Sequence, residues 1–300
     1  MPFSESQLET WSNQGATTSS ANTYNSIKSC IDSVNWKSGL SYNIYLQGSY
    51  KNTTNIRGNS DVDVVVELDS IFYSNKEKLP ADQLKEFNEH HDSGEYTLAD
   101  FKTAIIKKLN DYYGEASVKV GNRSIKVRGQ NGRLDADIVP CAQYREYNSF
   151  SILKTTDYAR GIVFWETETK NEVVNFPELH FRNGADKNAD ATNNYKPSIR
   201  IIKNMRSRMV EAGMIDENLS PSYFIECLLY NVPSITYNHN SYSDIIVGIL
   251  NFLYNTQEDN LKSFVCQNMQ RYLFGTSDQQ WDTADCLAFS SELIDFWNKG

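Results

Sequence analysis

Residues 46–68 contain the stretch that decides the fold, and two parts of it carry chemistry. The first part is Leu46-Gln47-Gly48-Ser49, and the second, after a polar loop, is Asp61-Val62-Asp63-Val64-Val65-Val66-Glu67-Leu68. A Gly-Ser turn that opens a helix offers backbone N–H groups and a hydroxyl to phosphate oxygens. Asp61 and Asp63 are spaced i and i+2 on an apolar strand, so both carboxylates point to one face of a sheet. The pattern predicts a site where carboxylates hold divalent cations against the phosphates of a substrate.

A second acidic strand follows downstream, at Arg133-Leu134-Asp135-Ala136-Asp137-Ile138-Val139-Pro140. Asp135 and Asp137 share one face by the same period of two, and only one of them is needed as a third ligand. We expect that ligand to be Asp137, because it directly precedes the apolar Ile138-Val139 pair. Proline cannot continue a central ladder, so Pro140 is expected to mark the strand end where active-site side chains emerge. Whether Asp135 also contributes is left open.

Gly-Ser, then Asp-x-Asp, then a lone Asp before a Val-Pro ending resembles the polymerase-β-like nucleotidyltransferase superfamily. Within it, the chain resembles the bacterial CD-NTases, relatives of animal cyclic GMP–AMP synthase and of the oligoadenylate synthetases. Lys203 on a helix, and Ser222 in Pro221-Ser222-Tyr223-Phe224-Ile225-Glu226, are similar to the family's lysine and serine that contact the triphosphate. The resemblance spans residues 40 to 230.

This resemblance implies the fold and the site. The fold is α+β, with a polymerase-β-like core of mixed sheet and N-terminal helices in residues 1–178, a helical lobe in residues 179–300, and a central cleft. Two Mg²⁺ or Mn²⁺ ions are expected on Asp61, Asp63 and Asp137. The residues expected to bind nucleotide are Gln47, Gly48, Ser49, Lys203 and Ser222.

The implied reaction is attack of a ribose hydroxyl on the α-phosphorus of a nucleoside triphosphate (ATP, GTP or a pyrimidine nucleotide), with pyrophosphate leaving. Further steps close a cyclic di- or trinucleotide second messenger, read by a downstream effector in anti-phage defence. Three alternatives stay open. They are a nucleotidyltransferase that modifies a small molecule, a protein or an RNA end; a nucleic-acid-activated sensor; and a catalytically inactive binding module.

Each motif also has a plainer interpretation. Asp61-Val62-Asp63 alone matches a solvated strand edge, and Lys203 alone matches an ordinary exposed lysine. Ser222 follows a good helix start, with Ser220 as the cap and Pro221 at the first helical position. His90-His91-Asp92 has no third partner at ligand spacing and is expected to be a solvated loop.

Composition restricts the class of protein. The 300-residue length fits two lobes, and the net charge of −9 argues against a broad DNA or RNA footprint. The five cysteines stand far apart without a Cys-x-x-Cys pair, so a zinc site is not supported. Their odd number suits a reducing cytoplasm. The N-terminus lacks the pattern of a signal peptide, and no apolar run reaches the ~18–20 residues of a membrane span.

Periodicity predicts helices and strands along the chain. Helices are expected over residues 4–11, 20–37, 97–113, 197–212, 221–231, 242–255, 257–274 and 280–298, with Gly213 and Gly275 as stops. Strands are expected over residues 42–47, 61–68, 118–120, 124–127, 134–139, 161–165 and 172–176. Residues 72–95 are expected to form an irregular surface excursion, and 183–194 a polar lead into the later helices.

The C-terminus is a candidate site of regulation. The chain ends Phe296-Trp297-Asn298-Lys299-Gly300. Some members of the resembled family are activated when a ubiquitin-transfer-like partner joins their C-terminal carboxylate to an amine. A slim terminal glycine suits that chemistry, so a conjugation partner at Gly300 is a hypothesis, with a frayed helix stop as the alternative.

Overall fold

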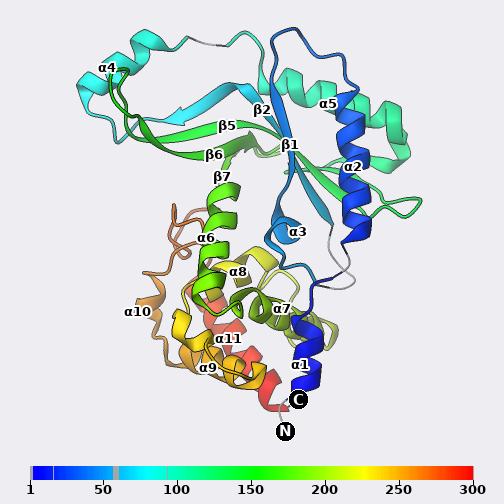
Figure 1. Ribbon diagram of the computed structural model, residues 1–300, viewed down its shortest axis with the longest axis vertical. Coiled ribbons are helices and arrows are strands. Elements are labelled where there is room, and N and C mark those ends of the chain that lie inside the picture. The colour runs from blue at the N-terminus through cyan, green and yellow to red at the C-terminus, as the bar shows by residue number, and fades with distance from the viewer. Residues whose placement is uncertain (1–2, 16, 57–60, 93, 300) are drawn as a thin grey trace. The chain divides into compact units, whose positions relative to one another are not determined.

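The computed structural model describes residues 3–15, 17–56, 61–92 and 94–299 (Figure 1). The helices are α1 (Glu5–Ser12), α2 (Thr18–Asp32), α3 (Gly48–Asn52), α4 (Ala81–His90), α5 (Leu98–Tyr113), α6 (Pro177–Asp190), α7 (Tyr195–Glu211), α8 (Ser222–Tyr230), α9 (Tyr242–Asn255), α10 (Glu258–Leu261) and α11 (Thr283–Lys299). The strands are β1 (Tyr42–Leu46), β2 (Val62–Asn75), β3 (Val118–Val120), β4 (Ile125–Val127), β5 (Ala136–Ser149), β6 (Asp157–Trp165) and β7 (Glu172–Asn175). The prediction of an α+β fold with a mixed sheet is confirmed.

The chain forms two compact units. The sheet unit contains Thr17–Gln47 and Asp61–Glu178, and the helical unit contains Met1–Ala16, Gly48–Ser60 and Leu179–Gly300. The chain therefore leaves the sheet unit for the last time between residues 178 and 179. Residues 3–15 and 48–56, which the sequence groups with the core, belong to the helical unit.

One mixed sheet organises the sheet unit, with strand order β1-β2-β5-β4-β3 and with β6 and β7 continuing from β5. β2 and β5 run parallel, and the other pairs are antiparallel. On one face, the even-numbered apolar residues of β2 are fully buried, from Val62 to Leu68. α2 and α5 cover the sheet (Figure 1) and bury Ile27, Phe101 and Ile105. Thr97 starts α5 with a capping box, in which its side chain and that of Asp100 bond each other's backbone N–H.

Pro140 does not end the second acidic strand, so that expectation is wrong. β5 runs on to Ser149, and Pro140 pairs in register with Val66 of β2. On its other edge, β5 pairs with β4 only as far as Ile138 and with β6 only from Ala142. Pro140 therefore lies in the gap between two partner strands, where a missing N–H costs no ladder hydrogen bond. The acidic side chains emerge at the beginning of β5, rather than at its end.

The expectation that residues 72–95 form an irregular excursion is wrong for residues 72–75 and 81–90, which form regular structure. β2 continues to Asn75 after a bulge between Leu68 and Phe72, and α4 follows. The reason is a small apolar cluster of Leu79, Phe87, Tyr147 and Phe150, which buries the apolar face of α4 against the far end of β5. His90 closes α4 rather than lying in a loop, and His91 stacks on Phe87 with ring centroids 4.1 Å apart.

Two further expectations change in the helical unit. Residues 183–194 are mostly helical, because α6 extends to Asp190. Residues 257–274 hold only the short α10, followed by irregular chain with isolated bridges that pair Val265 with Tyr272 and Phe274 with Trp281. Gly213, with φ of 67°, does end α7 as predicted, whereas Gly275 follows no helix.

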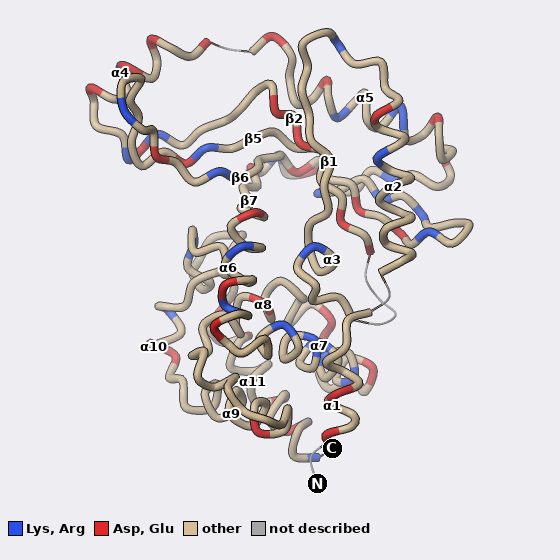
Figure 2. Tube along the Cα trace, viewed as in Figure 1, with Lys and Arg blue, Asp and Glu red and all other residues tan. Residues whose placement is uncertain are grey.

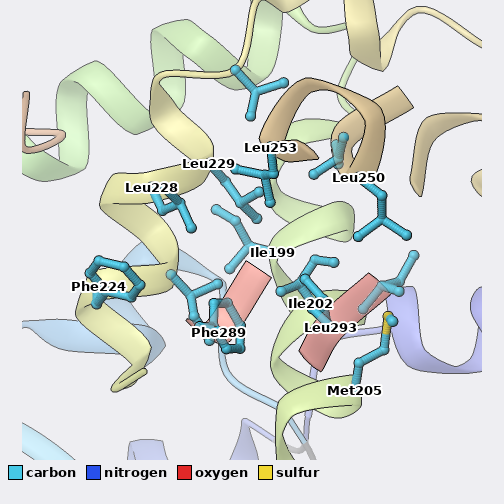
Figure 3. Packing of buried hydrophobic residues seen from close by; sticks show 14 of the residues in the cluster. Ile199, Ile202, Met205, Phe224, Leu228, Leu229, Leu250, Leu253, Phe289 and Leu293 are labelled. Carbon is cyan, nitrogen blue, oxygen red and sulfur yellow. The ribbon is translucent and has the colours of Figure 1, made fainter. Parts of the chain in front are cut away.

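The helical unit has one large core, formed by α7, α8, α9 and α11 (Figure 3). Figure 3 shows Ile199, Phe224 and Phe289 facing one another from three of these helices. α1 packs on α7 and α9, and its neighbour Phe3 contacts Trp11, Phe296 and Trp297 at 5.0, 5.2 and 5.9 Å between ring centroids. These aromatic contacts explain why the N-terminal helix belongs to the helical unit.

We expect Phe289→Ala to destabilise the protein by about 3–5 kcal/mol, because the change leaves a cavity in a core where this ring is fully buried. Leu287→Ala, on the same helix, is the matched control, since that side chain is 38% exposed. Urea unfolding measures both. Equal losses in the two variants would contradict the packing described here.

Candidate active site

Five residues form a transverse row across the sheet unit. Asp63 and Asp137 are register partners in the parallel strands β2 and β5. Lys126 of β4 is opposite Asp137, and Lys119 of β3 is opposite Lys126. Gln47, just after β1, donates its N–H to the Asp63 carbonyl at 3.0 Å. Because register partners share a face of the sheet, the structure brings Asp63 and Asp137 together as the sequence predicts.

Asp61 joins this group from the residue before β2. Its Oδ2 lies 3.9 Å from Lys126 Nζ, and Asp137 Oδ1 lies 3.9 Å from the same ammonium. Asp137 Oδ1 also accepts a hydrogen bond from Ser124 Oγ at 3.0 Å. Partial burial raises the pKa of the Asp61 carboxyl, and the charge of Asp137 raises it further, while Lys126 acts in the opposite direction. Asp61 and Asp137 are thus close enough for their carboxylates to interact electrostatically.

Asp135, the residue directly before β5, has a structural role. Its Oδ1 accepts the backbone N–H of Gly129 at 2.6 Å, which closes the turn before β5. A Cβ at Gly129 would lie 2.5 Å from the Arg133 carbonyl oxygen, so only glycine fits this turn. The pairing of Asp135 with the turn supports Asp137 as the ligand of choice.

The three carboxylates fit divalent cations by their chemistry. They are hard oxygen donors on one face, and the Lys126 ammonium already stands as a cation within 3.9 Å of two of them. Among the described residues, no three His, Cys, Asp or Glu side chains converge into a closed ligand cluster. An enclosed site is not required, because Mg²⁺ is held by one or two carboxylates together with substrate phosphates and water.

The Gly-Ser turn opens the five-residue helix α3 in the helical unit. Gly48 has φ of 64°, a left-handed conformation that glycine adopts without strain. Ser49 accepts the Thr54 N–H through its carbonyl at 2.9 Å. Thr53, also left-handed at φ of 58°, ends the helix. The turn therefore has the backbone geometry that the sequence predicts.

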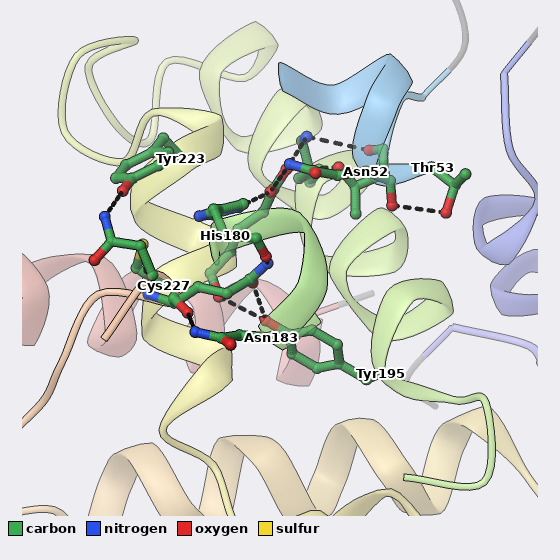
Figure 4. Close-up of polar contacts among 12 residues, drawn as sticks. Asn52, Thr53, His180, Asn183, Tyr195, Tyr223 and Cys227 are labelled. Atoms are coloured by element: carbon green, nitrogen blue, oxygen red, sulfur yellow. Dashed lines mark hydrogen bonds and ion pairs between the residues drawn. The ribbon is translucent and has the colours of Figure 1, made fainter. Parts of the chain in front are cut away.

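A buried carboxylate fixes the segment that follows the turn (Figure 4). Glu226 of α8 accepts hydrogen bonds from Thr54 Oγ1 at 2.6 Å and from Asn52 Nδ2 at 3.2 Å. His180 Nε2 of α6 lies 2.9 Å from it, and Lys203 Nζ of α7 lies 3.3 Å from it. Figure 4 shows Asn52 and His180 approaching the same point. Four segments of the helical unit are thereby joined through one side chain.

The same contacts set the charge of Glu226. Burial by itself raises the pKa of this carboxyl, but the Lys203 charge, the bond and charge of His180 and the Thr54 bond outweigh burial. Together they bring the pKa of Glu226 to about 2. Glu226 is therefore ionised at neutral pH inside the helical core.

Lys203 is neither exposed nor pointed at solvent. Only 4% of it is exposed, and its ammonium donates to the Thr54 carbonyl at 3.1 Å as well as pairing with Glu226. The plain alternative of a surface lysine is therefore wrong. This geometry makes Lys203 a support of the segment behind Ser49, and its contact with triphosphate stays a prediction.

Ser222 is the first residue of α8 and is exposed. The expected capping by Ser220 is wrong: Pro221 occupies the N-cap position and no side chain caps the helix. The Ser220 hydroxyl is buried, with no hydrogen-bond partner in the part of the chain that the structure describes. The Ser222 hydroxyl therefore does not substitute for a cap.

Sequence reasoning missed two charged residues, Lys126 and Glu226. The expected strand 124–127 included Lys126, but its pairing with the acidic strand could not be read from spacing. Glu226 carried a better signal, because it is the lone charge in the apolar run from Phe224 to Leu229. A charge in such a run requires a buried partner.

Charged residues of both signs are interspersed along the trace of both units (Figure 2). The five cysteines are buried free thiols. No described helix is both long enough and apolar enough to span a membrane. Gly300 lies outside the described residues, so its conjugation stays a prediction.

A mixed sheet with paired acidic strands, joined to a helical unit that carries the Gly-Ser turn, defines a nucleotidyltransferase of the polymerase-β-like type. Two family models match the chain. The cGAS/DncV-like nucleotidyltransferase C-terminal helical domain matches residues 182–298, and the nucleotidyltransferase domain matches residues 27–119.

Full-length relatives give the narrower assignment. The cyclic UMP-AMP synthase of Rhodothermus marinus is 42% identical, covering 99% of this chain and 98% of its own. The cyclic nucleotide synthase CdnE01 of Staphylococcus haemolyticus is 38% identical, covering both chains fully. The structure of Rhodothermus marinus CdnE c-UMP-AMP synthase with Apcpp and Upnpp matches with a TM-score of 0.88, at 42% identity, covering 99% of this chain and 97% of that one.

This chain therefore belongs to the CD-NTase family of cyclic nucleotide synthases, and it is a metal-dependent nucleotidyltransferase that makes a cyclic nucleotide from nucleoside triphosphates.

We expect Glu226→Gln to destabilise the protein by about 3 kcal/mol at pH 7, because it leaves the buried Lys203 ammonium without a counter-charge. Glu211→Gln removes an exposed carboxylate from α7 and is expected to change stability by less than about 0.5 kcal/mol. Urea unfolding compares both with the wild type.

The pH dependence of the Glu226→Gln effect has a defined sign. The pKa of Glu226 lies below its ordinary value of 4.5, so the ionised carboxylate contributes its full stability above that pH. The contribution is lost as the pH falls through about 2. The stability gap between wild type and variant should therefore narrow below pH 4.5. A constant gap between pH 6 and pH 3 would contradict the assignment.

Proposed function

We propose that this enzyme joins two nucleoside triphosphates into a cyclic dinucleotide, with UTP and ATP as its substrates. The pairing of Asp63 with Asp137 in adjacent parallel strands is the observation that carries the catalytic part of the proposal. The base choice is supported by the 42% identity to a cyclic UMP-AMP synthase over nearly the whole chain.

In this proposal Asp61, Asp63 and Asp137 hold two Mg²⁺ ions. When bound, such ions neutralise charge on the triphosphate and favour deprotonation of the attacking hydroxyl. Asp61 and Asp63 face the triphosphate, and Asp137 faces the ribose hydroxyl of the acceptor. The register of β2 and β5 supports this division, because it fixes the spacing of the two acidic strands.

The bond changes are those of an in-line displacement. The ribose oxygen forms a bond to the α-phosphorus, the bond between that phosphorus and the bridging oxygen of the β-phosphate breaks, and pyrophosphate leaves. The hydroxyl proton passes to solvent. A second displacement closes the ring. No covalent enzyme intermediate is needed, so positioning and charge neutralisation supply the rate enhancement.

Residues of the helical unit are proposed to contact the phosphates. The Ser49 hydroxyl and the backbone at Gly48 face the triphosphate, with Gln47 beside them in sequence. Ser222 adds a hydroxyl, and Lys203 acts on the triphosphate or supports the turn through Thr54. The product is proposed to be a second messenger in anti-phage defence, read by a downstream effector.

Mass spectrometry of phosphatase-treated products tests the substrate choice. The protein is incubated with Mg²⁺ and all four nucleoside triphosphates, and a phosphatase-resistant product containing one uridine and one adenosine is expected. A cyclic product with other bases would revise the base choice. Only linear or acceptor-linked products would contradict ring closure.

We expect Asp61→Asn combined with Asp63→Asn to abolish product formation while the melting temperature stays unchanged or rises slightly. Neutral amides are weak ligands for Mg²⁺, and two like charges are removed from one face. Asp135→Asn is the matched control, because its carboxylate serves the Gly129 turn. Wild-type turnover in the double variant would end the metal-site proposal, and loss of activity in Asp135→Asn with an unchanged melting temperature would add that residue to the ligands.

We expect Ser222→Ala to raise the KM for nucleoside triphosphate roughly tenfold or more, since a hydrogen bond to a charged group contributes about 1.5–3 kcal/mol. The melting temperature should not change, because Ser222 is exposed and does not cap α8. Steady-state kinetics and thermal unfolding measure the two quantities. An unchanged KM would remove Ser222 from the nucleotide site.

A further inference from the structure

Lys126 has an unusual position for a basic residue. It lies on β4 directly opposite Asp137, on the face of the sheet that carries the acids. Its Nζ is 3.9 Å from Asp61 Oδ2 and 3.9 Å from Asp137 Oδ1. Both distances exceed that of a normal hydrogen bond. The ammonium therefore attracts both carboxylates through its charge and hydrogen-bonds to neither of these oxygens.

The electrostatic situation of the acids explains what this charge does. Asp61, Asp63 and Asp137 carry like charges at the start of two adjacent strands, and such groups repel one another. The Lys126 ammonium, which lies 3.9 Å from an oxygen of Asp61 and 3.9 Å from an oxygen of Asp137, opposes this repulsion. The lysine side chain is 60% exposed, so its long flexible stem has room to move away from the acids.

We propose that Lys126 is a built-in counter-charge that holds Asp61 and Asp137 together without a divalent cation and competes with that cation for them. The proposal rests on the metal ligands proposed above. Lys126 is thus a positioning residue, which sets the cation concentration at which the site fills. It would keep the acids aligned between catalytic cycles and yield its place when the cation arrives with nucleotide.

The sign of the effect follows from Coulomb's law. An ammonium repels a divalent ion bound a few ångström away, and in a water-exposed site this repulsion corresponds to a change in affinity of roughly tenfold. Removing the charge should therefore tighten metal binding. If Lys126 instead served the bound metal site as a structural support, its removal would weaken binding.

The experiment measures Mn²⁺ binding without nucleotide, using the electron paramagnetic resonance signal of free Mn²⁺. We expect Lys126→Met to lower the Kd for Mn²⁺ three- to tenfold relative to wild type. Lys126→Arg keeps the charge and should bind with near wild-type affinity. Lys119→Met removes the same charge one strand, about 4.8 Å, further from the acids, so its effect should be smaller.

A second readout is the melting temperature. Without metal, Lys126→Met should melt below the wild type, because the acids lose their counter-charge, and added Mn²⁺ should raise its melting temperature more than that of the wild type. The double variant Asp61→Asn, Asp63→Asn serves as a control, because Mn²⁺ ions bound at this site should no longer bind to it.

The outcomes separate the two proposals. An unchanged or weaker Mn²⁺ affinity in Lys126→Met, with binding that the double variant removes, would overturn the role of Lys126 and leave the metal ligands intact. Binding that the double variant leaves unchanged would overturn both. An equal gain in Lys119→Met would show an effect of net charge and would also overturn the role of Lys126.

Discussion

The in-register parallel pairing of β2 with β5 is the constraint on which the sheet unit depends. A shift of one residue would turn every side chain of one strand to the other face, and would separate Asp63 from Asp137. Val62, Val64, Val66 and Leu68 oppose that shift, because their fully buried side chains share one face of the sheet, and a one-residue shift would replace them on that face by Asp63 and Glu67. The alignment of Asp63 with Asp137 therefore depends on the buried apolar residues of the opposite face.

The helical unit solves a different problem, which is to hold a short turn whose own five-residue helix has little stability. Glu226 does so from within the core, through Thr54 and Asn52. An ionised carboxylate is costly to bury unless its partners compensate, and here Lys203 and His180 do so. The ion pair between Lys203 and Glu226 also explains why Lys203, which the sequence predicts to contact substrate, is buried.

An enzyme with net charge −9 binds substrates that are themselves highly anionic. Cations are gathered locally in the helical unit, where Lys51 and Lys196 both lie over the Phe181 ring, at 4.5 and 5.6 Å from its centroid. In the sheet unit, Lys126 offsets the repulsion among the acids. The overall charge argues against a broad polyanion-binding surface but not against triphosphates, because the fields that act on a small ligand are local.

The sequence by itself determined the local elements and the chemistry of their side chains. The period of two around Asp61 and Asp63, the glycine before Ser49 and the helical spacing near Ile199 each depend on neighbouring residues, and local sterics decide them. Tertiary structure decided everything that depends on distant partners. It carried β5 through Pro140, because β4 and β6 leave a gap there, and it placed α4 against β5 by packing Phe87 on Tyr147. It buried Lys203 against Glu226 and placed Lys126 beside Asp137, since strand register and helix packing join residues whose separation in sequence gives no signal.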